Sequence, residues 1–383
     1  MSISSKTGGF SGCAVLLALV TCAPAPPVSA SQPAPLSKDA FKACYEAQAR
    51  LVPFSGVILV QRGNDVFAHT SGMMDEQQTV PITPATRFRL ASVQKVLTKV
   101  AVGQLADKGA LSLDAPIGKY VRGIPPEMAA ITIDQLLQHR SGVAGFLRMT
   151  PEAMTGLVSA TSARDLLPLI TSQPLEFRPG EREQYSNGGF WLLGVVIEAV
   201  SGKTYGEYLQ DEVFRPLRMS ATGLTVGPET AVRMTRMLPG QPPLATPHPV
   251  KMPMEPRGSP SGDGVSTADD LLRLGKALIG DSLVSAEIKA RLFPKRPGEP
   301  WRLGQSGGNI GTNTDFAVYP ESKVISVVLS NFDPPAGDLM GYVLRRVALG
   351  AGCAPLREED HPGPRRLMPP PEPGPRLPTR SAS

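Results

Sequence analysis

The sequence lacks the signatures of several functional classes. Its 39 lysines and arginines against 34 aspartates and glutamates give a formal charge of +5 without any basic run, which does not indicate a nucleic-acid partner. There are only four histidines, with no His-Glu-x-x-His motif and no clustered Cys/His spacing, so the sequence predicts no metal. No glycine-rich phosphate loop follows a predicted strand, and we therefore expect no nucleotide and no cofactor.

Long hydrophobic runs are also missing. The apolar stretch at 13–20 is too short to span a bilayer, follows the single charged residue Lys6, and precedes a proline-rich segment. Residues 28–30, Val-Ser-Ala, fit a signal-peptidase site, so 1–30 are predicted to be a signal peptide and the protein to be periplasmic or secreted. A competing interpretation is lipoprotein processing at Cys22, although the threonine before Cys22 fits that processing poorly. Only lipoprotein processing would predict a membrane anchor.

Cysteine is scarce, with four in 383 residues, and cleavage after Ala30 would leave Cys44 and Cys353. They lie near opposite ends of the mature chain. In an oxidising compartment two such cysteines can pair where the ends meet, so we expect a Cys44–Cys353 disulfide, with two separate thiols as the alternative.

The remaining composition is that of a globular protein. Hydrophobic residues make up 41% of the chain and charged residues 19%, enough to bury a large core in one domain with an insertion or in two domains. Patterning, caps and turn residues predict a series of elements. Helices are expected at 39–51, 92–108, 134–139, 189–200, 204–214, 267–279 and 337–350, and two hairpins at 54–61 with 65–71 and at 315–319 with 323–331.

This order predicts an α+β fold. The first and last parts of the chain most simply join one antiparallel sheet, and the helical middle forms an inserted layer. We place the sheet domain at 31–110 plus 265–356 and the helical domain at 111–264. Beyond 357 the chain is mostly proline, arginine and glycine, which predicts a disordered tail to 383.

Two serines compete for the role of nucleophile. Ser306 lies in GQSGG, which fits the G-x-S-x-G elbow, but an elbow needs a helix after the serine and then an acid and a histidine. Glycines and asparagines follow Ser306, and the only later histidine is His361 in the tail. Ser92 is the better candidate because Lys95, three residues on, would lie on the same helix face. A buried lysine with a lowered pKa can act as the base that a serine hydroxyl needs.

A second polar element is Tyr185-Ser186-Asn187, directly before an apolar helix. A phenol near a lysine can pass protons to and from a leaving group, and an amide can bond both the lysine and a substrate carbonyl. The alternative for this segment is a helix-capping loop.

Taken by themselves, Ser92 and Lys95 also fit a solvated helix face, but the apolar residues around them favour a buried helix start.

With these elements in order, the chain resembles the serine β-lactamase and penicillin-binding-protein-like family, in its class C, DD-peptidase and esterase branch. The resemblance runs from about Phe54 to Asn331. It rests on the segments TPATRFRLASVQKVLT, ITIDQLLQHRSGV, FRPGEREQYSNGGFWLLGVVIEAVSGKTYGEYL, GDGVSTADDLLRL and GQSGGNIGTNTDFAVYPESKVISVVLSN.

The resemblance implies a β-lactamase/transpeptidase-like α/β sandwich and a role for each residue. Ser92 would be the acylated nucleophile, Lys95 its base, and Tyr185 a proton-transfer group that also activates the deacylating water. Asn187 would orient Lys95 and hold the substrate amide. The oxyanion would lie between the backbone N–H groups of Ser92 and Gly308. The expected substrate is a small molecule or peptide, such as a cell-wall peptide, a β-lactam, an ester or a D-amino-acid amide.

GQSGG would then be the third motif of the family, whose backbone lines the cleft. Its residues Gln305, Ser306, Gly307 and Gly308 are predicted to bind substrate. The family usually has lysine or histidine where this chain has Gln305, so we expect weaker recognition of carboxylate-bearing β-lactams and favour neutral substrates. A non-catalytic cell-envelope binding protein is the rival interpretation. For His139, in LLQHRSG, we favour a structural role over a catalytic one.

Overall fold

The computed structural model describes residues 37–145, 151–237, 244, 246–251 and 257–360, with only the backbone for 151–154. The predicted signal peptide, the lipidation site Cys22 and the tail beyond residue 360 lie outside the described residues. The described residues of the predicted sheet and helical parts all fall within one compact unit. The domain boundaries at 110 and 264 stay predictions.

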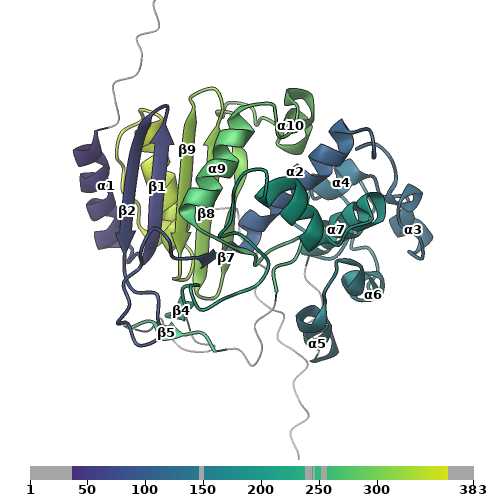
Figure 1. The fold of residues 1–383 in the computed structure, drawn as a ribbon, viewed down its shortest axis with the longest axis horizontal. Coiled ribbons are helices and arrows are strands. Elements are labelled where there is room, and N and C mark those ends of the chain that lie inside the picture. Colours follow the sequence, from purple (N-terminus) through teal and green to yellow (C-terminus); the bar gives the residue numbers. More distant parts are fainter. Residues whose placement is uncertain (1–36, 146–150, 238–243, 245, 252–256, 361–383) are drawn as a thin grey trace, which may run out of the picture. The chain divides into compact units, whose positions relative to one another are not determined.

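A five-stranded antiparallel sheet forms the centre of the structure, in the order β2-β1-β9-β8-β7 (Figure 1). The first hairpin joins β1 (Gly56–Arg62) to β2 (Asp65–Ser71), and the last joins β8 (Thr312–Tyr319) to β9 (Val324–Ser330). β1 pairs with β9, so the two ends of the chain share one sheet, as predicted. Every residue of β8 and β9 is buried, which is typical of central strands covered on both faces.

Helices cover both faces of this sheet. On one face α1 (Lys38–Leu51) packs beside α11 (Ala336–Ala348), which lies across β8 and β9. On the other face lies α9 (Ala268–Ile279), whose cap residue Thr267 accepts a hydrogen bond from Asp270 N–H. The α+β fold class predicted from the sequence is confirmed.

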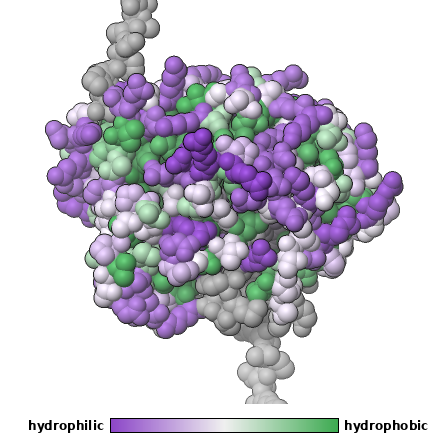
Figure 2. Space-filling view, viewed as in Figure 1, coloured by the Kyte–Doolittle hydropathy of each residue, from purple (hydrophilic) through white to green (hydrophobic). Residues whose placement is uncertain are grey.

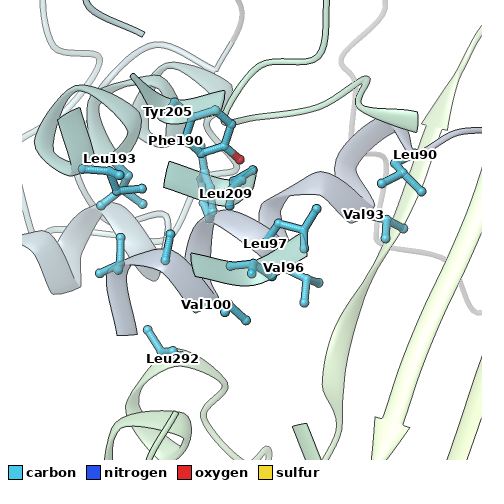
Figure 3. Close-up of a cluster of buried hydrophobic side chains, with 14 of the residues drawn as sticks. Leu90, Val93, Val96, Leu97, Val100, Phe190, Leu193, Tyr205, Leu209 and Leu292 are labelled. Atoms are coloured by element: carbon cyan, nitrogen blue, oxygen red, sulfur yellow. The ribbon is translucent and has the colours of Figure 1, made fainter. Parts of the chain in front are cut away.

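The middle of the chain is mostly helical. Its elements are α3 (Pro126–Ala129), α4 (Ile133–Leu137), α5 (Pro151–Ser159), α6 (Leu167–Thr171), α7 (Asn187–Ser201) and α8 (Tyr205–Leu209), with short strands β4 (Met234–Thr235), β5 (His248–Pro249) and β6 (Val265–Ser266). Helix α2 (Gln94–Asp107) packs against α7 and joins this part to the sheet. Side chains of α2, α7 and α8 form one apolar cluster between them (Figure 3).

Several predicted elements differ in detail. The helix expected at 92–108 begins as a 3-10 turn at Ala91–Val93, and the helix expected at 204–214 becomes π-helical at Gln210–Phe214. The helix expected from residue 189 begins at Asn187, because Ser186 caps it by accepting a hydrogen bond from Gly189 N–H. Helix α10 (Ala286–Leu292) was not predicted.

The two ends of the described chain meet beside α1. Cys44 on α1 and Cys353 after α11 are in disulfide geometry, with Cα atoms 5.7 Å apart. Gln48 reinforces this junction, since its amide donates to the backbone O of Leu356 at 2.9 Å and accepts from the N–H of Leu356 at 2.8 Å. The structure thus places the expected pair of cysteines together.

The exterior contrasts with these buried clusters. Figure 2 shows mostly hydrophilic residues on the face turned to the viewer, with hydrophobic residues in small scattered patches. Within the described part of the chain, no helix is both long and apolar enough to cross a bilayer.

A buried ion network beneath α11 supplies the first testable prediction. The carboxylate of Asp315 is fully buried and pairs with Arg302 at 2.9 Å and Arg345 at 2.5 Å. Asp315→Ala leaves these guanidinium groups without their buried counter-charge, so we expect the free energy of unfolding to fall by about 3–5 kcal/mol in urea titrations. The exposed pair Lys295–Glu321 is the control. Glu321→Ala should cost less than about 1 kcal/mol, and equal small losses would contradict the account.

Candidate active site

Ser92 lies in a buried turn that enters α2. Strand β3 (Phe88–Arg89) leads into the 3-10 turn η1 (Ala91–Val93), from which α2 continues. Ala91 has a φ of +43°, a left-handed conformation that non-glycine residues rarely adopt and that is often found at functional turns. The turn is held in place by apolar side chains that point into the core (Figure 3), among them Leu90, Val93, Val96, Leu97 and Val100.

Lys95 is fully buried in the first turn of α2 and has three hydrogen-bond acceptors around its amine. Its Nζ lies 3.2 Å from Ser92 Oγ, 2.7 Å from Asn187 Oδ1 and 2.5 Å from the backbone O of Ser261. The i to i+3 spacing therefore brings the amine to the hydroxyl, as predicted. The three acceptors come from three different segments of the chain.

Burial decides the charge of this amine. Removal from water lowers the pKa of Lys95 to about 7; the carboxylate of Asp263 opposes this shift and the charge of Lys99 adds to it. A substantial fraction of Lys95 is thus neutral near pH 7. A neutral amine keeps two N–H groups for Asn187 and Ser261, and its lone pair is then free to take the proton of the Ser92 hydroxyl.

Tyr185 completes the surroundings of the Ser92 hydroxyl. Its phenol oxygen lies 2.5 Å from Ser92 Oγ, and Lys95 Nζ lies 4.8 Å from the centre of the tyrosine ring. Burial raises the pKa of Tyr185 to about 12. The phenol is therefore neutral at physiological pH, so it can donate its proton, and it can accept one only while it passes its own proton on.

His139 supports Tyr185 from behind. The two rings lie with centroids 4.7 Å apart, and His139 Nδ1 accepts a hydrogen bond from the backbone N–H of Ser186 at 3.2 Å. Burial, reinforced by the charges of Lys95 and Lys99, lowers the pKa of His139 to about 3. The imidazole is neutral and its contacts are those of a packing residue, in line with the structural role favoured from the sequence.

Asn187 is positioned as the first residue of α7. Its backbone N–H donates to the O of Gly145 at 3.1 Å, while Ser186 caps the helix before it. The side-chain amide is thereby directed toward Lys95. Ser186 is a helix cap, the alternative considered for this segment, while Tyr185 contacts Ser92 and Asn187 contacts Lys95.

The GQSGG segment forms part of β7 (Leu303–Asn309), the edge strand beside the Ala91–Val93 turn that carries Ser92. A Cβ atom on Gly307 would lie 2.6 Å from the backbone O of Leu90 and 2.7 Å from the backbone N of Ser92. Only glycine permits this approach of two backbones. Thr314 on β8 holds the same contact, donating from Oγ1 to Leu90 O at 2.9 Å.

Ser306 is directed away from Ser92. Its hydroxyl donates to Asp315 Oδ1 at 2.7 Å, in the ion network beneath α11, and it is followed by strand rather than helix. It therefore lacks the surroundings of an elbow nucleophile. Side chains alternate along a strand, so Gln305 shares the face of Gly307. Substrate contacts at Gln305, Ser306 and Gly308 stay predictions.

Sequence patterns predicted no role for Ser261 or Asp263, in the segment before β6. The backbone O of Ser261 is an acceptor for Lys95, and Asp263 acts electrostatically on both Lys95 and Tyr185. A backbone acceptor leaves no residue-type signal. Asp263 lies in the quoted segment GDGVST, where a charged residue between two glycines could have marked it.

A cavity of about 670 Å³ opens beside these groups. Asn187, Ser261 and Asp263 lie on its wall, together with Asn309 at the end of β7. Ser92, Lys95 and Tyr185 are not part of the wall, so the cavity borders the reacting groups rather than containing them. Within the described ranges, no three His, Cys, Asp or Glu side chains are grouped so as to hold a metal ion.

Comparison with known proteins agrees with this geometry. The Beta-lactamase family model matches residues 48–349. The chain belongs to this family. The match covers most of the sequence and confirms the resemblance expected from the Ser92, Lys95, Tyr185 and Asn187 motifs.

Curated relatives match over part of their length. Protein flp of Staphylococcus aureus strain MW2 is 29% identical over 182 residues, which are 46% of this chain and 36% of flp. Penicillin-binding protein 4* of Bacillus subtilis strain 168 is 28% identical over 181 residues, 46% of this chain and 40% of the relative. The matches thus span less than half of the length of these relatives.

Solved structures share the fold more completely. A penicillin-binding protein from Bacillus halodurans aligns with a TM-score of 0.66 at 27% identity, covering 81% of this chain and 98% of the other. D-amino acid amidase from Ochrobactrum anthropi SV3 aligns with a TM-score of 0.68 at 21% identity, covering 82% and 98%. At that identity the amidase shows a common fold only.

The contact of Gly307 with the turn that carries Ser92 gives a second prediction. In Gly307→Ala the new methyl group meets backbone atoms of Leu90 and Ser92 that cannot move independently, so Ser92 is displaced. We expect its labelling by a fluorophosphonate to slow about 100-fold. In the control Gly280→Ala the nearest atom to the methyl group is 3.8 Å away, and labelling should be unchanged. Wild-type labelling in Gly307→Ala would contradict the assigned contact.

Proposed function

We propose that this protein is an exported serine hydrolase that cleaves an amide or ester bond through an acyl-enzyme on Ser92. The observation that supports it best is the position of the Ser92 hydroxyl, 3.2 Å from an amine with a pKa of about 7 and 2.5 Å from a neutral phenol. A serine with a general base within hydrogen-bond distance, itself oriented by Asn187, meets the requirements for an activated nucleophile.

In the acylation step Lys95 takes the proton of Ser92 as Oγ attacks the substrate carbonyl. The oxyanion is stabilised by the N–H groups of Ser92 and Gly308. As the tetrahedral intermediate collapses, Tyr185 donates its proton to the leaving amine or alcohol and regains one from the Lys95 ammonium. Lys95 is then neutral again and the acyl group remains on Ser92.

Deacylation runs through the same groups in reverse. Tyr185 takes a proton from the incoming water while its own phenol proton passes to the neutral amine of Lys95, and the resulting hydroxide attacks the acyl carbonyl. Collapse of this second intermediate returns that proton from Lys95 to Ser92 Oγ and releases the acid. Asn187 orients Lys95 throughout and holds the substrate amide.

The substrate is a small molecule or peptide, and the family members differ in which one they use. β-Lactam, cell-wall peptide, ester and D-amino-acid amide require the same reacting groups. Gln305 carries no charge where a lysine or histidine is usual, which favours substrates without a carboxylate at that position. It is also the one feature that favours a non-catalytic binding protein of the cell envelope.

Export is part of the proposal. A signal peptide at 1–30 would deliver the chain to the periplasm or the exterior, where the Cys44–Cys353 pair could oxidise; lipidation at Cys22 would instead tether it to a membrane. No nucleic acid, metal or cofactor is required by the chemistry described.

The proposal is tested with two covalent probes on the purified protein, Ser92→Ala and the control Ser322→Ala, whose serine lies in an exposed turn. We expect a fluorophosphonate to label the wild type and the control but not Ser92→Ala. Labelling by a fluorescent penicillin as well would indicate a site open to β-lactams, and labelling by the fluorophosphonate alone an esterase or amidase. No labelling by either probe would favour the binding protein.

The pH dependence follows from Lys95. Only its neutral form can accept the proton of Ser92, so the labelling rate should rise with pH through about 7 and then level off. Tyr185, with a pKa of about 12, should cause no loss up to about pH 10. Lys95→Arg keeps a positive charge at every assay pH and should abolish the rise. A wild-type rate that rises only near the ordinary pKa of lysine would contradict the assignment.

A further inference from the structure

Asp263 is a charged residue beside the reacting groups that the proposed mechanism does not use. Its side chain lies on the wall of the cavity, and its backbone N–H donates to the O of Ala91 at 3.2 Å. Two residues before it, the O of Ser261 accepts a hydrogen bond from Lys95. The carboxylate therefore belongs to a segment fixed at both ends against the nucleophile turn.

The backbone of Asp263 is strained. Its φ is +65°, in the left-handed region. A glycine at this position would adopt the same conformation without a steric cost. Aspartate tolerates the region better than most residues but still less well than glycine. Unusual backbone conformations of this kind cluster at functional sites, so a carboxylate held in one beside the reacting groups points to a functional role for Asp263.

The carboxylate also has no partner of its own. Among the described residues it makes no hydrogen bond or ion pair, whereas three other charged residues of the wall, Glu207, Arg233 and Lys251, have partners. Glu207 accepts from the N–H of Thr204 at 2.9 Å, and Lys251 pairs with Glu76 at 2.8 Å. Arg257 is exposed, where solvent screens its charge.

The carboxylate of Asp263 supplies a local negative charge, although the same wall also carries the cations Arg233, Lys251 and Arg257. The charge of Asp263 raises the pKa of both Lys95 and Tyr185, so it lies within electrostatic reach of the reacting groups. A lysine or histidine at position 305 would repel a bound ammonium group, but Gln305 does not. His139 is neutral as well, because burial lowers its pKa to about 3.

We propose that Asp263 binds the protonated amine of the substrate, so that the enzyme prefers amides or esters whose acyl part carries a free ammonium group. This inference rests on the proposed hydrolase function and names its substrate class. Apolar side chains of the same cavity wall, including Leu166, Trp191 and Leu224, would receive a bulky apolar substituent of that acyl part.

The test compares phenylalanine p-nitroanilide, in each enantiomer, with its N-acetyl and N-succinyl derivatives, which are neutral and anionic at the same position. For the better enantiomer we expect kcat/KM to be roughly 10- to 100-fold higher for the free amine than for the N-acetyl compound, the range of a charge-assisted hydrogen bond. Asp263→Asn should remove this preference while retaining hydrolysis of the N-acetyl compound. The ratio cancels any common effect of the substitution on Lys95.

Two controls separate the outcomes. Asp269→Asn removes a carboxylate from the exposed start of α9, outside the cavity wall, and should keep the preference. Fluorophosphonate labelling of Ser92, measured in each variant, reports on the acylation machinery without an amine. Two results would overturn the role of Asp263 in a protein that is labelled. One is an equal kcat/KM of the wild type for the free-amine and N-acetyl substrates. The other is a preference for the free amine in Asp263→Asn that equals that of the wild type. Absence of labelling in the wild type would overturn the proposed function itself.

Discussion

The burial of one amine controls the arrangement of this site. Lys95 has no exposed surface, and a buried charge is costly unless it is fully hydrogen-bonded or becomes neutral. The structure provides both conditions, with three acceptors at 2.5–3.2 Å and a pKa near 7. An amine that is close to equal parts charged and neutral at working pH is well matched to moving a proton from Ser92 and back.

Each contact of that amine comes from a different part of the fold. The 3-10 turn before α2 carries Ser92 and the first turn of α2 carries Lys95. Asn187 begins α7 and Tyr185 lies just before it, while the segment before β6 contributes the carbonyl of Ser261. Strand β7 closes the arrangement by placing Gly307 against the backbone of Ser92. The sheet and the helical part are therefore both needed to desolvate Lys95, which ties the chemistry to the packing of α2 between them.

Much of this could be predicted from the sequence where a local pattern was strong. Both hairpins, the helices α1, α9 and α11, and the pairs Ser92–Lys95 and Tyr185–Asn187 follow from turn residues, caps and spacing, and the Cys44–Cys353 contact from the scarcity of cysteine. Contacts between distant backbones could not be read in the same way, because they carry no residue-type signal. The acceptor at Ser261 O lies 166 residues from Lys95 and depends on long-range packing. The contact of Ser306 with Asp315 depends instead on the register of β7 against β8.

The most direct measurement of the central claim is the pKa of Lys95 itself. Protein labelled with ¹³C at lysine Cε can be titrated by NMR, with the Lys95 signal assigned by its absence from the spectrum of Lys95→Gln. The account predicts one lysine that titrates at about 7 and is missing in that variant. A Lys95 signal that titrates above about 10, as an exposed lysine does, would show that the amine is an ammonium at working pH and cannot be the base.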